Sequence, residues 1–259
     1  MNEWAQKTLK IVEKEDYLDK LQKVYPHEDA PREIDHQSLE EIRNAFQDKN
    51  NDVLIKKLLD LPKFPYKDSY VGFLRTDREA IKRNPETVKR ICDTLYQMGI
   101  NGVIDGISKP KEANTRRGQQ FTNWLKKKFE FVNTGYFEKS KKGILVLDVN
   151  EKEARDFCNK VLGAGISKRP DLVAKSGAEY IIGEAKFLSS SGGNQGRAFD
   201  DGMKLAANPS GKAHKIFILD GIHWIESGSE QFNQIQFGNA AILSVLLLGK
   251  YLKTVNSEH

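Results

Sequence analysis

A short hydrophobic run from Tyr180 to Leu188 constrains this chain most tightly, because it carries two opposite charges. A run of this length and composition predicts a mostly buried β-strand. Glu184 and Lys186 lie inside it, and burying a charge without a partner is costly. The fold must therefore supply both side chains with partners or with a ligand.

A second short strand is predicted just before this run, from Asp171 to Lys175, directly after Pro170. The connecting residues Ser176-Gly177 are typical of a two-residue hairpin turn. An acid, a hairpin and then acid-x-Lys is the layout of a metal-dependent phosphodiesterase site. Phosphodiester hydrolysis needs a cation to neutralise the pentavalent transition state and to activate water, and two acids can hold that cation.

Strand parity tests whether these side chains can meet. With Ser176-Gly177 as the turn, Asp171 faces Ile182, and residues two apart share one side of the sheet. Asp171, Glu184 and Lys186 then project from the same face, with the two acids as diagonal neighbours about 7–8 Å apart at the backbone. Their carboxylates can converge on one hard cation at about 2.1 Å per oxygen. A three-residue loop would break this parity.

The plainer interpretation is a surface hairpin with a Glu-Lys ion pair, which contributes less than about 1 kcal/mol. The bare spacing of an acid, twelve residues, a second acid, one residue and a lysine also arises by chance. The apolar neighbours of Glu184 and the Pro170-Asp171 start favour the functional interpretation.

Composition sets wider limits. The formal net charge is +5 and the isoelectric point is near 8.9, which permits nucleic-acid binding without requiring it. Cys92 and Cys158 are far apart and match no metal-binding pair, so they are expected to be reduced thiols. The first residues contain no signal-peptide core, and Ala240–Leu248 is too short to span a bilayer. We expect a soluble, cytoplasmic protein.

The predicted elements divide the chain into a helical N-terminal region, residues 1–107, and an α/β core, residues 108–259. The α/β class follows from the order of helices and strands in the second part, which predicts a mixed sheet flanked by helices. Periodicity and capping predict helices at Trp4–Val24, Ser38–Gln47, Asp52–Leu59, Pro85–Met98, Glu151–Leu162, Gln195–Ala207 and Asn233–Lys253. Lys215–Asp220 is predicted as a strand, and Gly143–Asp148 as a strand or as the lead into the next helix.

Two further groups of residues are candidates for DNA contacts. Arg116 and Arg117 lie near the start of a predicted helix that Asn114 or Thr115 would cap, and cations there can neutralise phosphates. Asn194 and Gln195 follow two glycines, which allow backbone to approach a ligand closely. A solvated helix face and a plain flexible turn are the alternatives. For Asp200-Asp201, solvated helix residues are favoured over extra ligands.

On Pro170-Asp171 and Glu184-Ala185-Lys186, the chain resembles the PD-(D/E)xK nuclease superfamily, and within it the type II restriction endonucleases. The stretch from 112 to 125 also looks like the helix that precedes the core in one group of restriction enzymes. The resemblance covers roughly residues 110–220. It implies that Asp171 and Glu184 bind Mg²⁺ and that Lys186 is the catalytic lysine.

The same resemblance implies cleavage of double-stranded DNA leaving 5′-phosphates, a homodimer, and a paired DNA methyltransferase. The N-terminal region would then supply DNA contacts or dimer surface. Many members also carry a glutamate on the helix before the core, where this chain offers Gln119, Gln120 or Asn123. That departure puts a second metal site in doubt. The alternatives are a repair or structure-specific nuclease with the same core, and a DNA-binding module with an inactive core.

Overall fold

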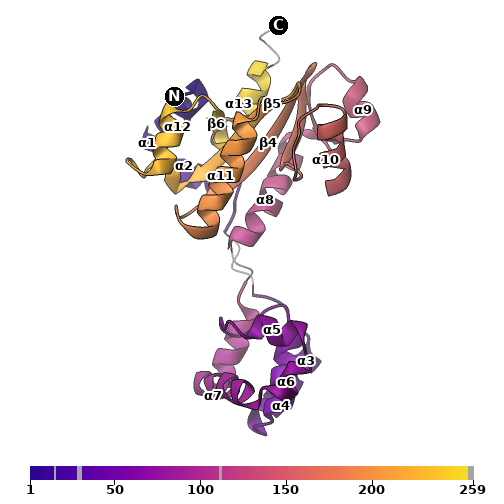
Figure 1. Ribbon diagram of the computed structural model, residues 1–259, viewed down its shortest axis with the longest axis vertical. Coiled ribbons are helices and arrows are strands. Elements are labelled where there is room, and N and C mark those ends of the chain that lie inside the picture. Colours follow the sequence, from indigo (N-terminus) through magenta and orange to yellow (C-terminus); the bar gives the residue numbers. More distant parts are fainter. Residues whose placement is uncertain (15, 28–30, 111–112, 256–259) are drawn as a thin grey trace. The chain divides into compact units, whose positions relative to one another are not determined.

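The computed structural model describes residues 1–14, 16–27, 31–110 and 113–255, without the side chains of 113–115. The chain divides into two compact units (Figure 1). Residues 1–27 and 113–259 form one, which we call the sheet unit, and residues 28–112 form the other, the helical unit.

The sheet unit is built on a six-stranded sheet whose spatial order is the order of the strands in the chain. The second, third and fourth strands form an antiparallel meander, and the fifth pairs in parallel with the fourth. The outermost two strands pair in parallel with their neighbours. The strands are β1 (Glu130–Val132), β2 (Ile144–Leu147), β3 (Leu172–Ser176), β4 (Glu179–Leu188), β5 (His214–Gly221) and β6 (Ala241–Leu243).

Helices cover this mixed sheet, which confirms the predicted α/β class and is consistent with the core that the resemblance implies. The helical segments of the sheet unit are α1 (Glu3–Lys14), α2 (Tyr17–Gln22), α8 (Ala113–Lys128), α9 (Thr134–Lys139), α10 (Glu151–Lys160), α11 (Gly193–Ala207), the 3₁₀ turn η1 (Ile222–Trp224), α12 (Glu230–Phe237) and α13 (Val245–Val255). No helix in the described residues is long and apolar enough to cross a membrane.

Helix α11 lies across β4 and β5 (Figure 1), where Phe199 meets Phe217 with ring centroids 5.7 Å apart. Phe217 is the partner of Glu184 in the β4–β5 register, so α11 covers the same side of the sheet as Glu184. Gly202 of α11 lets this helix approach closely, because a Cβ there would overlap the Phe217 ring.

The helical unit contains α3 (His36–Gln47), α4 (Asn51–Asp60), α5 (Val71–Thr76), α6 (Ala80–Arg83) and α7 (Pro85–Ser108). Its own core is apolar, with Ile42, Leu58 and Ile91 fully buried. Helix α7 runs further than predicted but is interrupted at Gly99, whose φ of 72° is a left-handed conformation that favours glycine.

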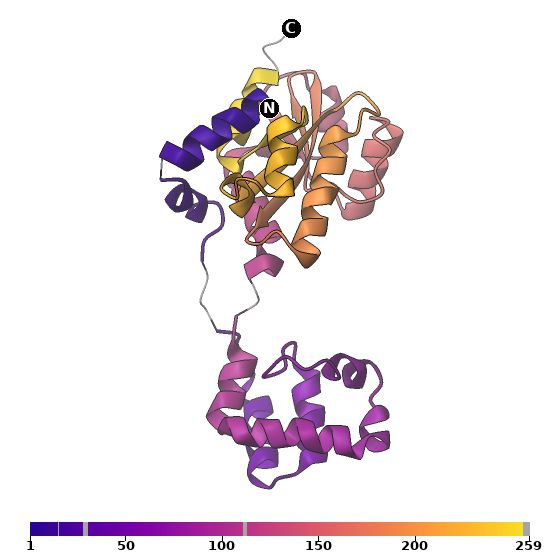
Figure 2. The ribbon, with the colours of Figure 1, turned by 60° about the vertical axis from the view of Figure 1, so that its left-hand side comes forward.

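The division at residue 107 differs from the observed one, because the first 27 residues belong to the sheet unit (Figure 2). Trp4, Tyr17 and Leu21 are buried in the same core as the sheet, and the ring centroids of Trp4 and Tyr251 are 5.2 Å apart. The predicted helix Trp4–Val24 is two shorter helices, α1 and α2. Periodicity indicates that a helix has an apolar face but not which core receives it.

The predicted helix Asn233–Lys253 is wrong. The chain forms α12, then strand β6, then α13, and β6 extends the sheet by pairing Ile242 with Phe217. A short apolar run is compatible with either a buried strand or a buried helix, so periodicity alone does not distinguish them. The unpaired edge of β5 decides the outcome, since it offers β6 backbone hydrogen bonds.

The β3–β4 hairpin turns one residue later than predicted. Ser176 pairs with Glu179, so the turn residues are Gly177 and Ala178, and Gly177 has a φ of 58°. Glycine at the first turn position with positive φ is typical of a type II′ turn. The pairing shifts by two residues, which preserves the predicted parity.

A buried carboxylate, Asp220 at the end of β5, connects the N-terminal segment to the sheet. It accepts hydrogen bonds from the Tyr17 hydroxyl at 3.0 Å, the Ser244 hydroxyl at 2.6 Å and the Val245 N–H at 3.2 Å. The Gly221 N–H donates to the Tyr17 hydroxyl at 3.1 Å. Burial raises the pKa of Asp220 to about 6, against these donors, which favour its charged form.

The raised pKa of Asp220 predicts a pH-dependent stability. Between the unfolded pKa of about 4 and the folded value of about 6, the folded state binds the proton more tightly, so stability is lost as pH rises. Relative to Asp220→Asn, the wild type should lose about 2 kcal/mol of unfolding free energy between pH 4 and pH 7. Urea unfolding at both pH values measures this change, and a pH-independent difference would contradict it.

Two helical glycines provide a matched test of packing. Gly202→Ala should lower the free energy of unfolding by about 1–3 kcal/mol, because the new methyl group overlaps buried Phe217. Gly249→Ala in α13 meets nothing within 4 Å and should raise it by up to about 1 kcal/mol through helix propensity. Thermal unfolding of both variants checks this, and equal effects would contradict it.

Candidate active site

Asp171, Glu184 and Lys186 meet at one place on the sheet. Asp171 directly precedes β3. Glu184 and Lys186 are two residues apart on β4, so their side chains project from the same face of the sheet. The pairing of Leu172 with Gly183 brings Asp171 opposite Glu184 rather than diagonal to it. In this register the side chains of Asp171, Glu184 and Lys186 lie on the same face of the sheet and close together.

The Lys186 ammonium bridges the two carboxylates. Its Nζ lies 2.6 Å from Glu184 Oε1 and 3.0 Å from Asp171 Oδ2. The Ala185 N–H also donates to Asp171 Oδ2, at 2.9 Å. The three side chains are partly shielded, with exposed fractions of 34% for Asp171, 17% for Glu184 and 27% for Lys186. This shielding strengthens the mutual attraction of the charges.

The electrostatics keep the lysine charged. Burial alone would lower the pKa of Lys186, but the charges of Asp171 and Glu184 outweigh it and the pKa is raised. Burial, followed by the charge of Asp171, raises the pKa of Glu184. In this arrangement Lys186 is a cation and a hydrogen-bond donor at neutral pH.

The donor set fits Mg²⁺. Within the described residues, no hydrogen bond to protein is found for Asp171 Oδ1 or Glu184 Oε2, so one oxygen of each acid is available to a ligand. Mg²⁺ typically binds one or two carboxylates and completes its octahedron with water and phosphate oxygens. The described part of the chain contains no cluster of three or more His, Cys, Asp or Glu residues arranged to hold a metal.

The polar residues of the preceding helix are engaged elsewhere. Gln120 donates its side-chain N–H to the Pro26 carbonyl at 2.7 Å, and Gln119 donates to the Asn123 side chain at 2.9 Å. Gln120 and Gln119 therefore already have partners away from the Asp171 carboxylate. Asn114 and Thr115, the expected caps of this helix, lie outside the residues whose side chains are described.

Arg117 supports β4 from the opposite face. It donates to the Phe187 carbonyl at 2.7 Å, and its guanidinium lies 3.8 Å from the centroid of the Phe187 ring. Tyr25 contacts the same ring edge-on, with centroids 5.3 Å apart. Burial lowers the pKa of Arg117. Arg117 thus holds Phe187, the residue next to Lys186, in place. Arg116, on the same helix, is half-buried.

Gln195 organises the loop that leaves β4. Its Oε1 accepts hydrogen bonds from the N–H groups of Ser189 at 2.6 Å and Ser190 at 3.2 Å. Asn194, beside it, is exposed. Of the two candidates after the glycines, Gln195 has a defined structural partner and Asn194 presents its side chain to solvent.

A cavity of about 170 Å³ beside Glu184 includes residues that the sequence did not single out for the site. Lys168 and Lys204 contribute to its lining together with Asp201, and Lys168 Nζ lies 2.6 Å from Asp201 Oδ2. The sequence favours a solvated helix residue at Asp201, and its side chain is 43% exposed and pairs with Lys168. The one available signal was that Lys168 lies three residues before Asp171.

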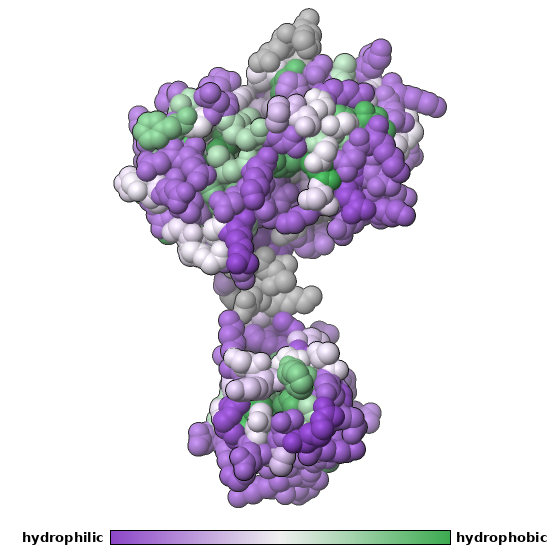
Figure 3. Space-filling model, viewed as in Figure 1, coloured by the Kyte–Doolittle hydropathy of each residue, from purple (hydrophilic) through white to green (hydrophobic). Residues whose placement is uncertain are grey.

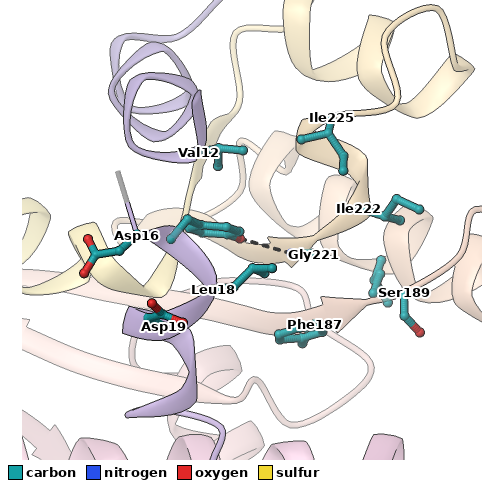
Figure 4. Close-up of a pocket in the computed structure, with 11 residues that line it drawn as sticks. Val12, Asp16, Leu18, Asp19, Phe187, Ser189, Gly221, Ile222 and Ile225 are labelled. Carbon is teal, nitrogen blue, oxygen red and sulfur yellow. Dashed lines mark hydrogen bonds between the residues drawn. The ribbon is translucent and has the colours of Figure 1, made fainter. Parts of the chain in front are cut away.

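A larger, mainly apolar cavity of about 620 Å³ lies at the ends of β4 and β5 (Figure 4). It is lined by Leu18, Phe187 and Ile222 among others, and its charged residues are Asp16 and Asp19. Two acids and no basic residue make this cavity unsuited to a phosphate backbone. The charged cleft at Glu184 is therefore the better candidate, although it is smaller.

The face seen in Figure 3 is mostly hydrophilic, with apolar residues in scattered patches. The described residues include single exposed apolar side chains, such as Phe73 and Phe237, whereas the exposed Leu18 and Ile225 both line the cavity of about 620 Å³. Scattered residues of this kind are normal on a protein surface.

Comparison with protein-family models finds a match to the Tsp45I type II restriction enzyme model over residues 2–255. No curated protein and no solved structure matches the chain.

The loop contacts predict different effects at two adjacent residues. Gln195→Ala removes the acceptor for the Ser189 and Ser190 amides, at a local cost of about 1–2 kcal/mol, so these amides should exchange about tenfold faster. Asn194→Ala is the control and should leave the exchange unchanged. Hydrogen–deuterium exchange of the loop measures both, and equal rates in the two variants would contradict the role of Gln195.

Proposed function

The chain belongs to the Tsp45I type II restriction enzyme family, and we propose that Asp171, Glu184 and Lys186 form its catalytic centre. Membership makes the chain a restriction endonuclease, a site-specific deoxyribonuclease that binds DNA. The observation that carries the proposal is the meeting of two acids and a lysine on one sheet face, with the lysine within 3.0 Å of both carboxylates.

We propose that Asp171 and Glu184 hold Mg²⁺ through the oxygens that make no protein hydrogen bond. Bound there, Mg²⁺ would neutralise charge on the transferring phosphoryl group and favour ionisation of a water molecule. Asp171 is oriented for this role by the Ala185 N–H, which fixes one carboxylate oxygen and leaves the other to face a ligand.

Lys186 is proposed to orient the attacking water and to contact a phosphate oxygen. Its ammonium has three N–H donors, and its raised pKa keeps it charged at neutral pH. Two donors are directed at Glu184 and Asp171, so a water or phosphate oxygen takes the third or displaces one of these contacts. A donor held next to the developing negative charge stabilises the transition state more than the ground state. The charged lysine thus acts by binding and positioning, because an ammonium cannot accept the proton of the attacking water.

The PD-(D/E)xK pattern supports the finer assignments. We propose Mg²⁺-dependent cleavage of double-stranded DNA leaving 5′-phosphates, by a homodimer whose symmetry matches a two-fold symmetric target. A paired DNA methyltransferase would protect host DNA, and the site of action would be the prokaryotic cytoplasm. Arg116 and Asn194 are proposed to contact DNA directly. For Arg117 and Gln195, we propose that holding β4 and its loop is the larger part of their role.

The distribution of charge suggests which unit meets the phosphates. Residues 28–112 contain 15 lysines and arginines and 16 aspartates and glutamates, whereas the rest of the chain contains 26 and 20. The positive excess therefore lies in the sheet unit, where we expect most phosphate contacts. For the helical unit, this balance favours base contacts or dimer surface.

The test of this function is incubation with unmethylated phage DNA in Mg²⁺ and in EDTA. We expect a reproducible ladder of fragments in Mg²⁺ and intact DNA in EDTA. End-labelling of the fragments should find 5′-phosphates. A smear, or equal cleavage in EDTA, would contradict the proposed chemistry.

Asp171→Ala and Lys186→Ala should each lower the cleavage rate by at least about 1,000-fold, because each removes a group that acts on the transition state. The fold and most of the DNA affinity should remain. Circular dichroism and a binding assay in EDTA provide the controls. Full activity of either variant would refute the assignment of the site.

A further inference from the structure

The loop that precedes Asp171 is fixed at several points. Asn159 of α10 holds Ile166 through two hydrogen bonds, donating to its carbonyl and accepting from its N–H, each at 2.8 Å. Asn208 donates to the Ala164 carbonyl at 3.0 Å. Two residues after Ile166 comes Lys168, so the backbone that carries this lysine is already placed.

The side chain of Lys168 is held as well. Its Nζ lies 2.6 Å from Asp201 Oδ2 on α11, although 73% of the lysine side chain is exposed. An ammonium has three N–H donors, and Asp201 takes one of them. The pair therefore orients a solvent-facing cation and leaves donors for a ligand.

Lys168 shares its cavity with Glu184. The cavity of about 170 Å³ is lined by both residues, by Asp201 and by Lys204. The charge of Lys168 also acts on Glu184 and favours its ionised form. The charge of Lys186 in turn acts to lower the pKa of Lys168. Lys186 of β4 contacts Glu184 at 2.6 Å, and Lys168 of the loop and Lys204 of α11 line the cavity beside it.

We propose that Lys168 binds a phosphate of the DNA strand being cut, next to the scissile phosphate at Asp171, Glu184 and Lys186. The proposal deepens the proposed function and rests on it. A DNA strand carries phosphates on both sides of the bond that is cleaved, so a second oriented cation in the same cleft can fix its register.

Asp201 acts as a positioning residue for Lys168. An exposed ion pair between a loop and a helix is held weakly, so a phosphate can share or replace the carboxylate. The aspartate keeps the ammonium near the cavity before DNA arrives, but its own negative charge also repels a phosphate. Because the pair is exposed and weak, this repulsion is the larger effect of Asp201 on DNA affinity. Removing Lys168 therefore makes the cavity more negative, and removing the charge of Asp201 makes it more positive. If the pair were purely structural, both substitutions would weaken DNA binding equally.

The experiment compares full-length Lys168→Ala, Lys168→Arg, Asp201→Asn and a control, Lys160→Ala. Lys160 is equally exposed, at 76%, and pairs with Asp156 at 3.1 Å within α10. The probe is a short fluorescent DNA duplex of mixed sequence, titrated in EDTA at several salt concentrations. Melting temperatures verify that all variants fold.

Lys168→Ala should raise Kd about tenfold and reduce the slope of log Kd against log salt by about 1. Lys168→Arg should stay close to the wild type. Asp201→Asn should bind as tightly as the wild type or tighter, because it removes a negative charge but keeps the lysine. Lys160→Ala should be unchanged. Cleavage by Lys168→Ala should show a raised KM with kcat within a few-fold of the wild type.

Equal weakening in Lys168→Ala and Asp201→Asn would mean that the pair is structural and would overturn the proposal. So would a Lys168→Ala variant indistinguishable from Lys160→Ala. Failure of the wild type to cut DNA in Mg²⁺ would refute the proposed function instead. The two failures are separable, because binding is measured without metal and cleavage with it.

Discussion

The pairing of β3 with β4 is the constraint on which the rest of the sheet unit depends. Strand β4 pairs with β3 on one side and with β5 on the other, so its register also sets where α11 can pack. A slip of one residue would turn Glu184 and Lys186 to the opposite face and bring their apolar neighbours to the cleft. The glycine turn at Gly177 and the buried side chains of β3 prevent that slip.

Burial and charge are balanced differently at two carboxylates. Asp220 is fully buried and is stabilised by hydroxyl and amide donors, which join α2, β5 and the start of α13. Glu184 is only partly buried and is stabilised by the ammonium of Lys186. The first arrangement holds the N-terminal segment against the sheet. The second leaves carboxylate oxygens open to a ligand, as a nuclease centre requires.

The proposed centre could be predicted from sequence because its chemistry is local. Charges inside an apolar strand demand a partner, and parity places Asp171 on the same face whether the turn begins at Ser176 or at Gly177. Lys168 was missed because its role depends on Asn159 and Asp201, which come from two different helices. No spacing rule connects such residues.

The sequence by itself determined the α/β class, the hairpin parity and the shared face of Asp171, Glu184 and Lys186, because these follow from periodicity and residue chemistry. Only the tertiary structure decided that residues 1–27 join the sheet unit and that Ala241–Leu243 is a strand. Both outcomes depend on partners far away in the chain. An apolar face buries itself against whichever surface is available, and a short apolar run becomes a strand where a sheet edge offers it hydrogen bonds.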